Sequence, residues 1–248
     1  MPLGLSFDFW NTLFADGREP LRHTRRMERL HAESQKYRPV EMSEVEQVMR
    51  ASSEYFHREW QEHQRTPTAK ERLDLMTGLL SIRFTTDQTA ETVEYFGNLI
   101  FEVPPEPLPY AGKLIRNLSR SHPLGIISDT GYISGRHIRL FLAQQDLLHC
   151  FTSLIFSDEH ENSKPHVSVF QKTAANLGVE TGQLIHTGDL ERTDINGARN
   201  AGCGSIRFTG AVASAAHNSE ADQIIGSYQQ YMPAVRRICQ DAGNHKAG

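Results

Sequence analysis

The hydrophobic pattern of the chain changes twice, and these changes constrain its fold more than any other feature. Residues 3–7 form a short apolar run that ends at Asp8, which is typical of a buried strand. Over residues 18–102 glycine is rare and apolar residues recur at helical spacing, so we expect three to five helices there and almost no strand. After the proline-rich segment 104–109, helix and strand patterns alternate up to residue 208.

This alternation predicts the fold class. We expect strands at 124–127, 154–156, 184–186 and 205–208, and helices at 112–118, 134–144, 167–177, 194–201 and 221–239. Helices and strands in regular turn are typical of a parallel sheet that is covered on both faces. We therefore predict an α/β fold, a Rossmann-like doubly wound parallel sheet with an all-helical cap. The predicted domains are 1–15 with 105–248 for the core, and 16–104 for the cap.

Composition excludes several classes of function. The net charge of −4 argues against a nucleic-acid-binding protein. No apolar stretch reaches the ~20 residues of a membrane-spanning helix, and the first residues do not resemble a signal peptide. Three cysteines at wide spacing form no disulfide framework. We expect a cytoplasmic protein without a membrane partner, either a monomer or a homodimer.

Polar residues follow the predicted strands at the edge where parallel sheets bind ligands. They are Asp8, Trp10, Asn11 and Thr12 after the first strand, Ser128 and Asp129 after the second, Lys164 at the start of a helix, and Asp189 and Asp194 near the strand at 184–186. The carboxyl ends of parallel strands share one edge, so we expect carboxylates, a hydroxyl group, a lysine and turn amides to converge there.

Four short motifs occur in a fixed order: Asp8 to Thr12, Ser128, Lys164, and Gly188-Asp189 followed by Asp194. With this order, each motif lying after a strand or at a helix start, the chain resembles the haloacid dehalogenase superfamily with a helical cap inserted after the first strand. The resemblance implies a hydrolase and covers nearly the whole chain.

The resemblance also implies roles for these residues. Asp8 is expected to be the nucleophile, and the hard oxygen ligands of a Mg²⁺ ion are expected from Asp8, the backbone carbonyl of Trp10, Asp189 and Asp194. Lys164, Ser128 and Thr12 are expected to balance charge and hold the transferring phosphoryl group. Ser128, Asp129, Trp10 and Asn11 are expected to contact the substrate.

Position 10 departs from the phosphatase pattern. Phosphatases of the superfamily usually carry a second Asp there as general acid and base, and Asn11 replaces the usual glycine. Tryptophan transfers no proton, and general acid–base catalysis contributes roughly 10²–10⁴-fold. We therefore expect a slow phosphatase, a preference for good leaving groups, or an acid from elsewhere. The candidates are Glu159, His160, Glu161, His166 or a residue of the cap.

Three functions remain open. The leading one is a Mg²⁺-dependent phosphatase that acts on a small phosphorylated metabolite through an aspartyl-phosphate on Asp8. The second is a metal-independent 2-haloacid dehalogenase, because those relatives carry a bulky aromatic residue at the position of Trp10. The Asp189 and Asp194 pattern favours the metal-dependent enzyme, since two carboxylates near Asp8 repel one another without a cation. The third is a non-catalytic binding protein. The arginines of residues 18–38 are expected on the cap surface, with one of them a candidate to face an anionic substrate.

Overall fold

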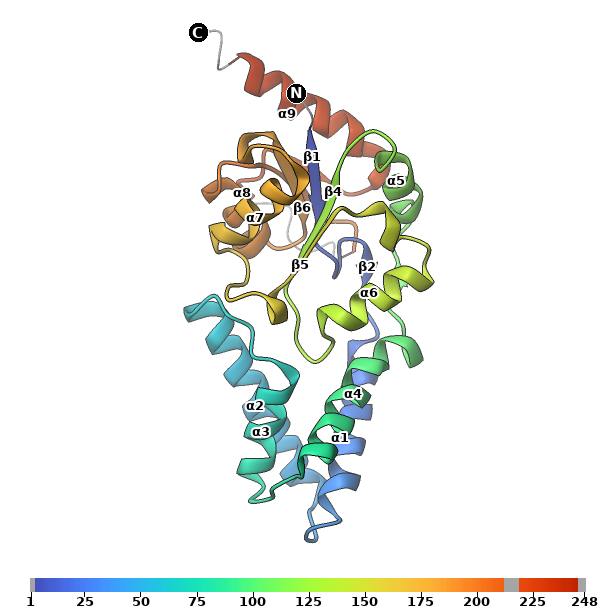
Figure 1. The fold of residues 1–248 in the computed structure, drawn as a ribbon, viewed down its shortest axis with the longest axis vertical. Coiled ribbons are helices and arrows are strands. Elements are labelled where there is room, and N and C mark those ends of the chain that lie inside the picture. Colours follow the sequence, from blue (N-terminus) through green and yellow to red (C-terminus); the bar gives the residue numbers. More distant parts are fainter. Residues whose placement is uncertain (1–2, 212–218, 245–248) are drawn as a thin grey trace.

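The computed structural model describes residues 3–211 and 219–244, and its centre is a six-stranded sheet (Figure 1). The strands are β1 (Gly4–Phe7), β4 (Leu124–Ser128), β5 (Ser153–Phe156), β6 (Leu184–Gly188), β7 (Gly204–Phe208) and β8 (Gln223–Ile225). Their order is β5-β4-β1-β6-β7-β8, and every neighbouring pair is parallel. In this order β1 is central, with Phe7 aligned to Ile126 on one side and Thr187 on the other.

Helices cover both faces of the sheet because its strands are apolar on both. On β4, Ile126 packs in a cluster that includes side chains of α5, α6 and α9, whereas the next residue, Ile127, packs in a cluster with α7 and α8. These helices are α5 (Ala111–Leu118), α6 (Gly135–Gln144), α7 (Val167–Leu177), α8 (Asn196–Asn200) and α9 (Tyr231–Asn244). The predicted doubly wound α/β fold is confirmed.

Four helices between β2 and β3 form the cap, residues 19–102. They are α1 (Glu19–Ser34), α2 (Met42–Glu62), α3 (Ala69–Leu79) and α4 (Thr86–Glu102). Buried residues such as Leu30, Met49, Leu73 and Phe96 give the cap a hydrophobic cluster of its own. The cap lies at the end of the sheet toward which β1 runs (Figure 1). The all-helical character is confirmed, while the domain boundaries at 16 and 104 stay a prediction.

The two crossings between core and cap lie side by side. Strand β2 (Phe14–Ala15) pairs antiparallel with β3 (Glu106–Pro107), so that the outgoing and returning segments form one short ladder. An ion pair of 3.0 Å between Arg18 and Glu106 continues this contact on the cap side. The proline-rich segment is therefore the return linker, as predicted, and it is also hydrogen-bonded to the outgoing one.

The expected strands and helices of the core lie within about two residues of those observed, except near the C-terminus. The single helix expected at 221–239 is wrong, because Gln223–Ile225 forms β8 and pairs with β7, and α9 begins only at Tyr231. Gly226 and a short turn at Tyr228–Gln230 separate the two. The helix expected at 194–201 begins earlier, as a π-helical turn at Glu191–Ile195.

The remaining structural predictions concern cysteines and membranes. Cys150, Cys203 and Cys239 are free thiols, as expected from their spacing. Within residues 3–211 and 219–244, no helix is both long and apolar enough to cross a membrane.

Candidate active site

A buried ion-pair cluster lies at the carboxyl ends of the central strands. Asp8 directly follows β1, and its Oδ1 lies 2.8 Å from Nζ of Lys164. The same ammonium group lies 2.6 Å from Oδ1 of Asp194. All three side chains are less than one-tenth exposed. Burial lowers the pKa of Lys164, but the charges of Asp194 and Asp8 outweigh it and hold that pKa above its usual value.

Asp189 completes a group of three carboxylates. It directly follows β6, and oxygen atoms of Asp8, Asp189 and Asp194 lie within 4.8 Å of one another. Burial and the charges of Asp194 and Asp8 raise the pKa of Asp189 to about 8. Burial also raises the pKa of Asp8, although Lys164 opposes it. The single positive charge of Lys164 therefore does not balance the negative charge of these three carboxylates.

Asp194 is held in place by its backbone and by a buried histidine. It lies in the π-helical turn after β6, where its Oδ2 accepts a hydrogen bond of 3.0 Å from the amide of Leu190. A Cβ atom at Gly188 would lie 2.1 Å from Cγ of Asp194, so only glycine fits there. Nε2 of His186 lies 3.0 Å from Oδ1 of Asp194, and its Nδ1 lies 3.0 Å from the hydroxyl of Ser6.

These contacts set the charge of Asp194. Burial alone would raise its pKa, but Lys164 and His186 lower it below the usual value. The described contacts of Asp194 satisfy both of its oxygens and favour its ionised form, whereas burial and the neighbouring carboxylates raise the pKa of Asp189.

The loop after β4 connects the cluster to the cap. The Ser128 hydroxyl is buried and comes near enough to Asp8 to lower its pKa, without a regular hydrogen bond to any described atom. Asp129 accepts hydrogen bonds from the amide of Lys164, at 3.1 Å, and from the indole of Trp60 in α2, at 2.8 Å. Burial raises the pKa of Asp129, and the Lys164 charge opposes that effect.

The loop after β1 carries the remaining motif residues. Asn11 has a φ of 52°, in the left-handed region that favours glycine and tolerates asparagine. Its Oδ1 accepts a hydrogen bond of 3.0 Å from the amide of Asp16 and thereby closes the loop. Thr12 is fully buried, and its hydroxyl has no described hydrogen-bond partner. Asparagine therefore keeps the backbone conformation in which glycine is the usual residue.

Trp10 lines a small pocket between core and cap. Its ring packs edge to face on Phe9, with ring centroids 4.8 Å apart, and the guanidinium of Arg22 lies 5.6 Å from it. The pocket has a volume of about 150 Å³. Besides Trp10 it is lined by Asp16, Glu19, Arg26, Arg72, Gly131, Tyr132 and Ile133. Its acidic residues, Asp16 and Glu19, both pair with arginines.

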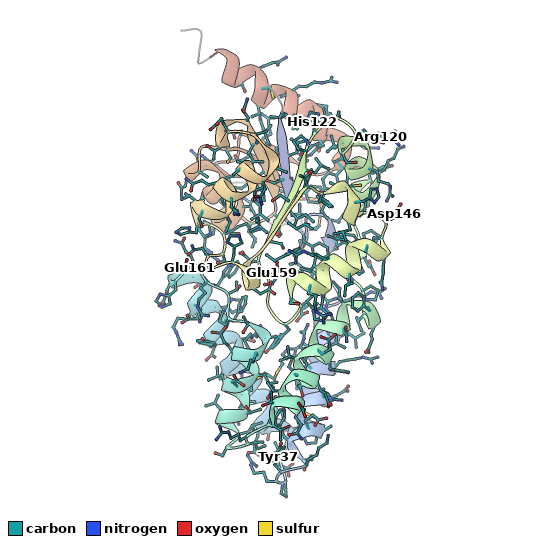
Figure 2. All side chains as sticks on the ribbon, viewed as in Figure 1. Tyr37, Arg120, His122, Asp146, Glu159 and Glu161 are labelled. Atoms are coloured by element: carbon teal, nitrogen blue, oxygen red, sulfur yellow. The ribbon has the colours of Figure 1, made fainter. Side chains whose placement is uncertain are left out.

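The structure brings most of the expected site residues together. Asp8, Lys164, Asp189 and Asp194 form one cluster, and Ser128 and Asp129 contact its members. The four candidate acids are not among the described partners of this cluster. Glu159 pairs with Arg139, and Nδ1 of His166 accepts from the amide of Ser168. Glu159 and Glu161 are exposed and lie where core and cap meet (Figure 2).

Sequence reasoning missed three features of the site. Arg22 and Arg26 are buried between core and cap, so the expectation of a surface position is wrong for these two arginines. Trp60 and His186 contact the aspartates without belonging to a motif. For His186 the available signal was its position inside a predicted buried strand, where a titratable side chain needs a polar partner.

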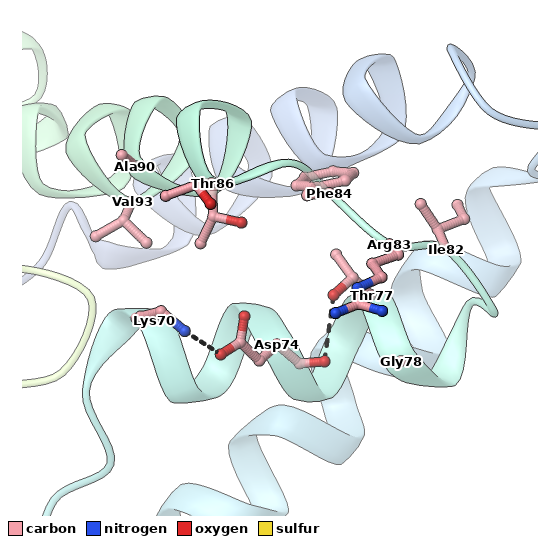
Figure 3. A pocket seen from close by; sticks show the side chains of 11 residues that line it. Lys70, Asp74, Thr77, Gly78, Ile82, Arg83, Phe84, Thr86, Ala90 and Val93 are labelled. Carbon is pink, nitrogen blue, oxygen red and sulfur yellow. Dashed lines mark hydrogen bonds and ion pairs between the residues drawn. The ribbon is translucent and has the colours of Figure 1, made fainter.

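A second cavity lies on the cap, away from the carboxylates. It has a volume of about 680 Å³ and lies between α3 and α4 (Figure 3). Its acidic residue, Asp74, pairs with Lys70 at 2.6 Å. Lining residues such as Thr77 and Phe84 belong to the cap, so the cavity does not reach the strand ends.

Solved structures share this fold over nearly their whole length. A 2-haloacid dehalogenase from Pseudomonas syringae pv. Tomato superimposes with a TM-score of 0.71 at 16% identity, covering 96% of this chain and 99% of that one. A HAD phosphatase from Thermococcus onnurineus gives 0.67 at 20% identity, covering 95% and 98%. At these identities the likeness establishes the fold, and the two neighbours differ in the activity their names state.

Sequence relatives match a shorter part of the chain. A phosphoglycolate phosphatase of Salmonella paratyphi A is 33% identical over 96 residues, which are 38% of this chain and 38% of that protein. The Escherichia coli K12 enzyme of the same name is 29% identical over 117 residues, 46% of this chain and 44% of its own length. The matches thus span less than half of each relative. The family model for haloacid dehalogenase-like hydrolases, by contrast, matches residues 7–208, so the chain belongs to this hydrolase family.

Proposed function

We propose that the protein is a Mg²⁺-dependent phosphatase that hydrolyses a small phosphorylated metabolite, with Asp8 as the nucleophile. The observation that carries this proposal is the group of three carboxylates at the ends of β1 and β6, with Lys164 bound to two of them. Phosphatases among the sequence relatives support the same reaction class.

The residues present fit a divalent cation. Asp8, Asp189 and Asp194 offer hard oxygen atoms within 4.8 Å of one another, the donor type that Mg²⁺ prefers. The raised pKa of Asp189 indicates negative charge in excess of what Lys164 neutralises. These three side chains would hold the ion, with the backbone carbonyl of Trp10 as the further ligand that the family resemblance implies. When bound, the cation supplies positive charge that reduces repulsion between Asp8 and the phosphoryl oxygens.

The chain's own residues then act as follows. An oxygen of Asp8 attacks phosphorus, the bond from phosphorus to the leaving oxygen breaks, and an aspartyl-phosphate forms. Water attacks that phosphorus, releases inorganic phosphate and restores the Asp8 carboxylate. Lys164 favours the ionised form of Asp8, opposing the effect of burial, and stabilises charge on the transferring group. The hydroxyls of Ser128 and Thr12 are buried without regular partners and are the donors we assign to its oxygens.

Proton transfer to the leaving oxygen is the weak step. Trp10 donates no proton to it, and Asp16 and Glu19, which line the pocket beside Trp10, are both engaged in ion pairs with arginines. We therefore propose that the enzyme prefers phosphate groups on good leaving groups and is slow on alkyl phosphates.

The test compares the wild type with Asp8→Asn on nitrophenyl phosphate. We expect turnover that requires Mg²⁺ and falls at least about 10⁴-fold in the variant. Asp74→Asn, which alters an exposed carboxylate of the cap, serves as the control and should retain full activity. A wild type that binds Mg²⁺ but hydrolyses no phosphate ester would instead indicate a non-catalytic binding protein.

A metal-independent 2-haloacid dehalogenase is the second candidate, favoured by one observation. Lys164 forms an ion pair with Asp8, and the aromatic Trp10 follows Asp8 by two residues in the sequence. Halide release from a 2-haloacid in the presence of a chelator, lost in Asp8→Asn, would select this activity. We rank this activity second because Asp189 and Asp194 lie beside Asp8, and such a group of carboxylates fits a metal-dependent enzyme better.

A further inference from the structure

Arg72 on α3 is a buried cation that forms no ion pair with any residue that the structure describes, although Glu19 lies near enough to act on its charge. Arg72 is 6% exposed, and its Nε donates a hydrogen bond of 3.1 Å to the hydroxyl of Ser52. The guanidinium lies 3.6 Å from the ring centroid of Tyr132 and 4.9 Å from that of Phe56. Among the described residues, no carboxylate lies within ion-pair distance of it.

The surrounding charges do not supply the missing partner. Arg22 and Arg26 are also buried, and these two arginines already engage Asp16 and Glu19. Three guanidinium groups therefore share two carboxylates, and Nε of Arg26 is buried without a hydrogen-bond partner. An uncompensated buried charge is costly unless something pairs with it. The ring contacts of Arg72 offset part of this cost.

The unpaired charge faces the pocket beside the proposed catalytic residues. Arg72 and Arg26 both line the 150 Å³ pocket, together with Trp10 and Gly131. Nη1 of Arg72 lies 3.5 Å from the position that a Cβ atom at Gly131 would occupy. Trp10 and Gly131 belong to the loops that carry Asp8 and Ser128. The cap therefore directs a positive charge at the same two loops that would hold the phosphoryl group.

We propose that Arg72, assisted by Arg26, binds a second oxyanion of the substrate, a carboxylate or a second phosphoryl group. This inference rests on the proposed function, because the first phosphoryl group is the one that Asp8 attacks. A planar guanidinium held against the rings of Tyr132 and Phe56 offers a fixed pair of donors to such a group. The pocket has the volume of roughly five liquid water molecules, so the second oxyanion is joined to the phosphate by a short linker of a few atoms.

Binding measurements test the proposal independently of turnover. Phosphonopropionate, ethylenediphosphonate and propylphosphonate share a phosphonate and differ only in the group at the other end. With Mg²⁺ present, calorimetry on the wild type should give Kd values at least about 30-fold lower for one or both of the probes with a second anionic group than for propylphosphonate. Whichever of the two binds more tightly identifies the second group as a carboxylate or a phosphoryl group.

Arg72→Gln should abolish this preference while leaving propylphosphonate binding unchanged. Arg72→Lys keeps the positive charge but loses the planar guanidinium with its paired N–H donors, so it should retain only part of the preference. Arg50→Gln on the exposed side of α2 is the matched control and should behave as the wild type. Melting temperature separates a binding role from a structural one: loss of an unpaired cation should leave Tm within about 3 °C of the wild type.

Two outcomes would overturn the inference. One is a wild type that binds the three probes equally, and the other is an Arg72→Gln variant that keeps the preference. Failure of the proposed function looks different: the probes would bind with the expected preference, but no phosphate ester would be hydrolysed in an Asp8-dependent manner.

Discussion

At the scale of single residues, backbone geometry explains two positions of the site. Gly188 is glycine because a Cβ atom would overlap Asp194, and Asn11 occupies a left-handed conformation that few other side chains tolerate. The departure from the usual glycine at position 11 therefore leaves the loop intact. At position 10, in contrast, tryptophan offers no group that could transfer a proton in the proposed reaction.

Restoring a carboxyl group at position 10 tests that conclusion. Trp10→Asp should raise kcat/KM on alkyl phosphates by between about tenfold and 10⁴-fold, because it supplies a general acid. Nitrophenyl phosphate has a good leaving group and should gain much less. Trp10→Phe controls for the loss of the indole, and steady-state phosphate release measures all three proteins. Equal gains on both ester types would argue against a missing acid.

His186 is expected to act through Asp194. His186→Gln removes the ring that bridges Ser6 and Asp194, so the carboxylate loses its orientation. Metal affinity should fall by about 10–100-fold, as for other residues that orient a metal ligand. Ser6→Ala removes only the hydrogen bond to Nδ1 of His186 and should lower the metal affinity by a smaller factor. Calorimetric titration with Mn²⁺ measures both, and an unaltered Kd in His186→Gln would contradict the assignment.

The residues found by sequence were those that belong to ordered motifs. Asp8, Lys164, Asp189 and Asp194 were predicted because each follows a strand or begins a helix, and the parallel topology then brings them to one edge. The burial of Arg22 was not predictable in this way. Helical periodicity shows which face of α1 is polar, but not that this face packs against the core.

At the scale of elements, the C-terminus of α2 is tied to the core by Trp60. Its indole donates to Asp129, and the guanidinium of Arg192 lies 4.1 Å from its ring. Two further contacts lie beside it: the amide of Ser163 donates to the carbonyl of Gln64 at 2.7 Å, and the hydroxyl of Thr66 donates to that of Ser157 at 2.5 Å. This end of the cap therefore contacts the loops that carry Lys164 and Ser128.

Loss of the indole should loosen this contact. Trp60→Phe keeps an aromatic ring but removes a hydrogen bond to a charged group, worth about 1.5–3 kcal/mol. Amide exchange at residues 63–66 should therefore accelerate about tenfold or more. Tyr37→Phe, at the far tip of the cap (Figure 2), is the control and should leave exchange at these residues unchanged. Exchange as slow as in the wild type would show that the neighbouring contacts suffice.

Elements with a strong local pattern were predictable, and short ones were not. The strands and helices from 111 to 208 follow from alternating apolar runs, which report burial on both faces of a sheet. The three-residue strand β8 has no such pattern; it is a strand because β7 offers it an unpaired edge. The ladder between β2 and β3 likewise depends on two segments that are remote in sequence.

At the scale of the whole molecule, the carboxylate group is expected to couple stability to pH and, under the proposed function, to metal. The pKa of Asp189, raised to about 8, exceeds its value in an unfolded chain. A carboxyl group of this kind contributes stability at low pH, and that contribution is lost as the pH rises toward 8. Without a cation, Tm should therefore fall over this range, and in Asp189→Asn that part of the fall should disappear.

Magnesium should reverse the trend. Binding requires ionised Asp189, so below pH 8 the apparent affinity should weaken about tenfold for each pH unit. The rise in Tm on adding Mg²⁺ should accordingly be larger at high pH than at low pH, and a chelator should remove it. Thermal scans of the metal-free and Mg²⁺-loaded protein across pH 5–9 check both signs. A Mg²⁺ effect that is independent of pH would contradict the assignment of Asp189.

The paired ladder of β2 and β3 has a consequence for how the protein diversifies. The chain enters and leaves the helical insertion through two adjacent strands, in which Phe14 and Pro107 are paired. The helices between these two strands could therefore change in length or sequence while the strand order that brings Asp8 and Asp189 together stays as it is. Under the proposed function, the side chains that select the substrate and those that react with it would then lie on separate segments of the chain.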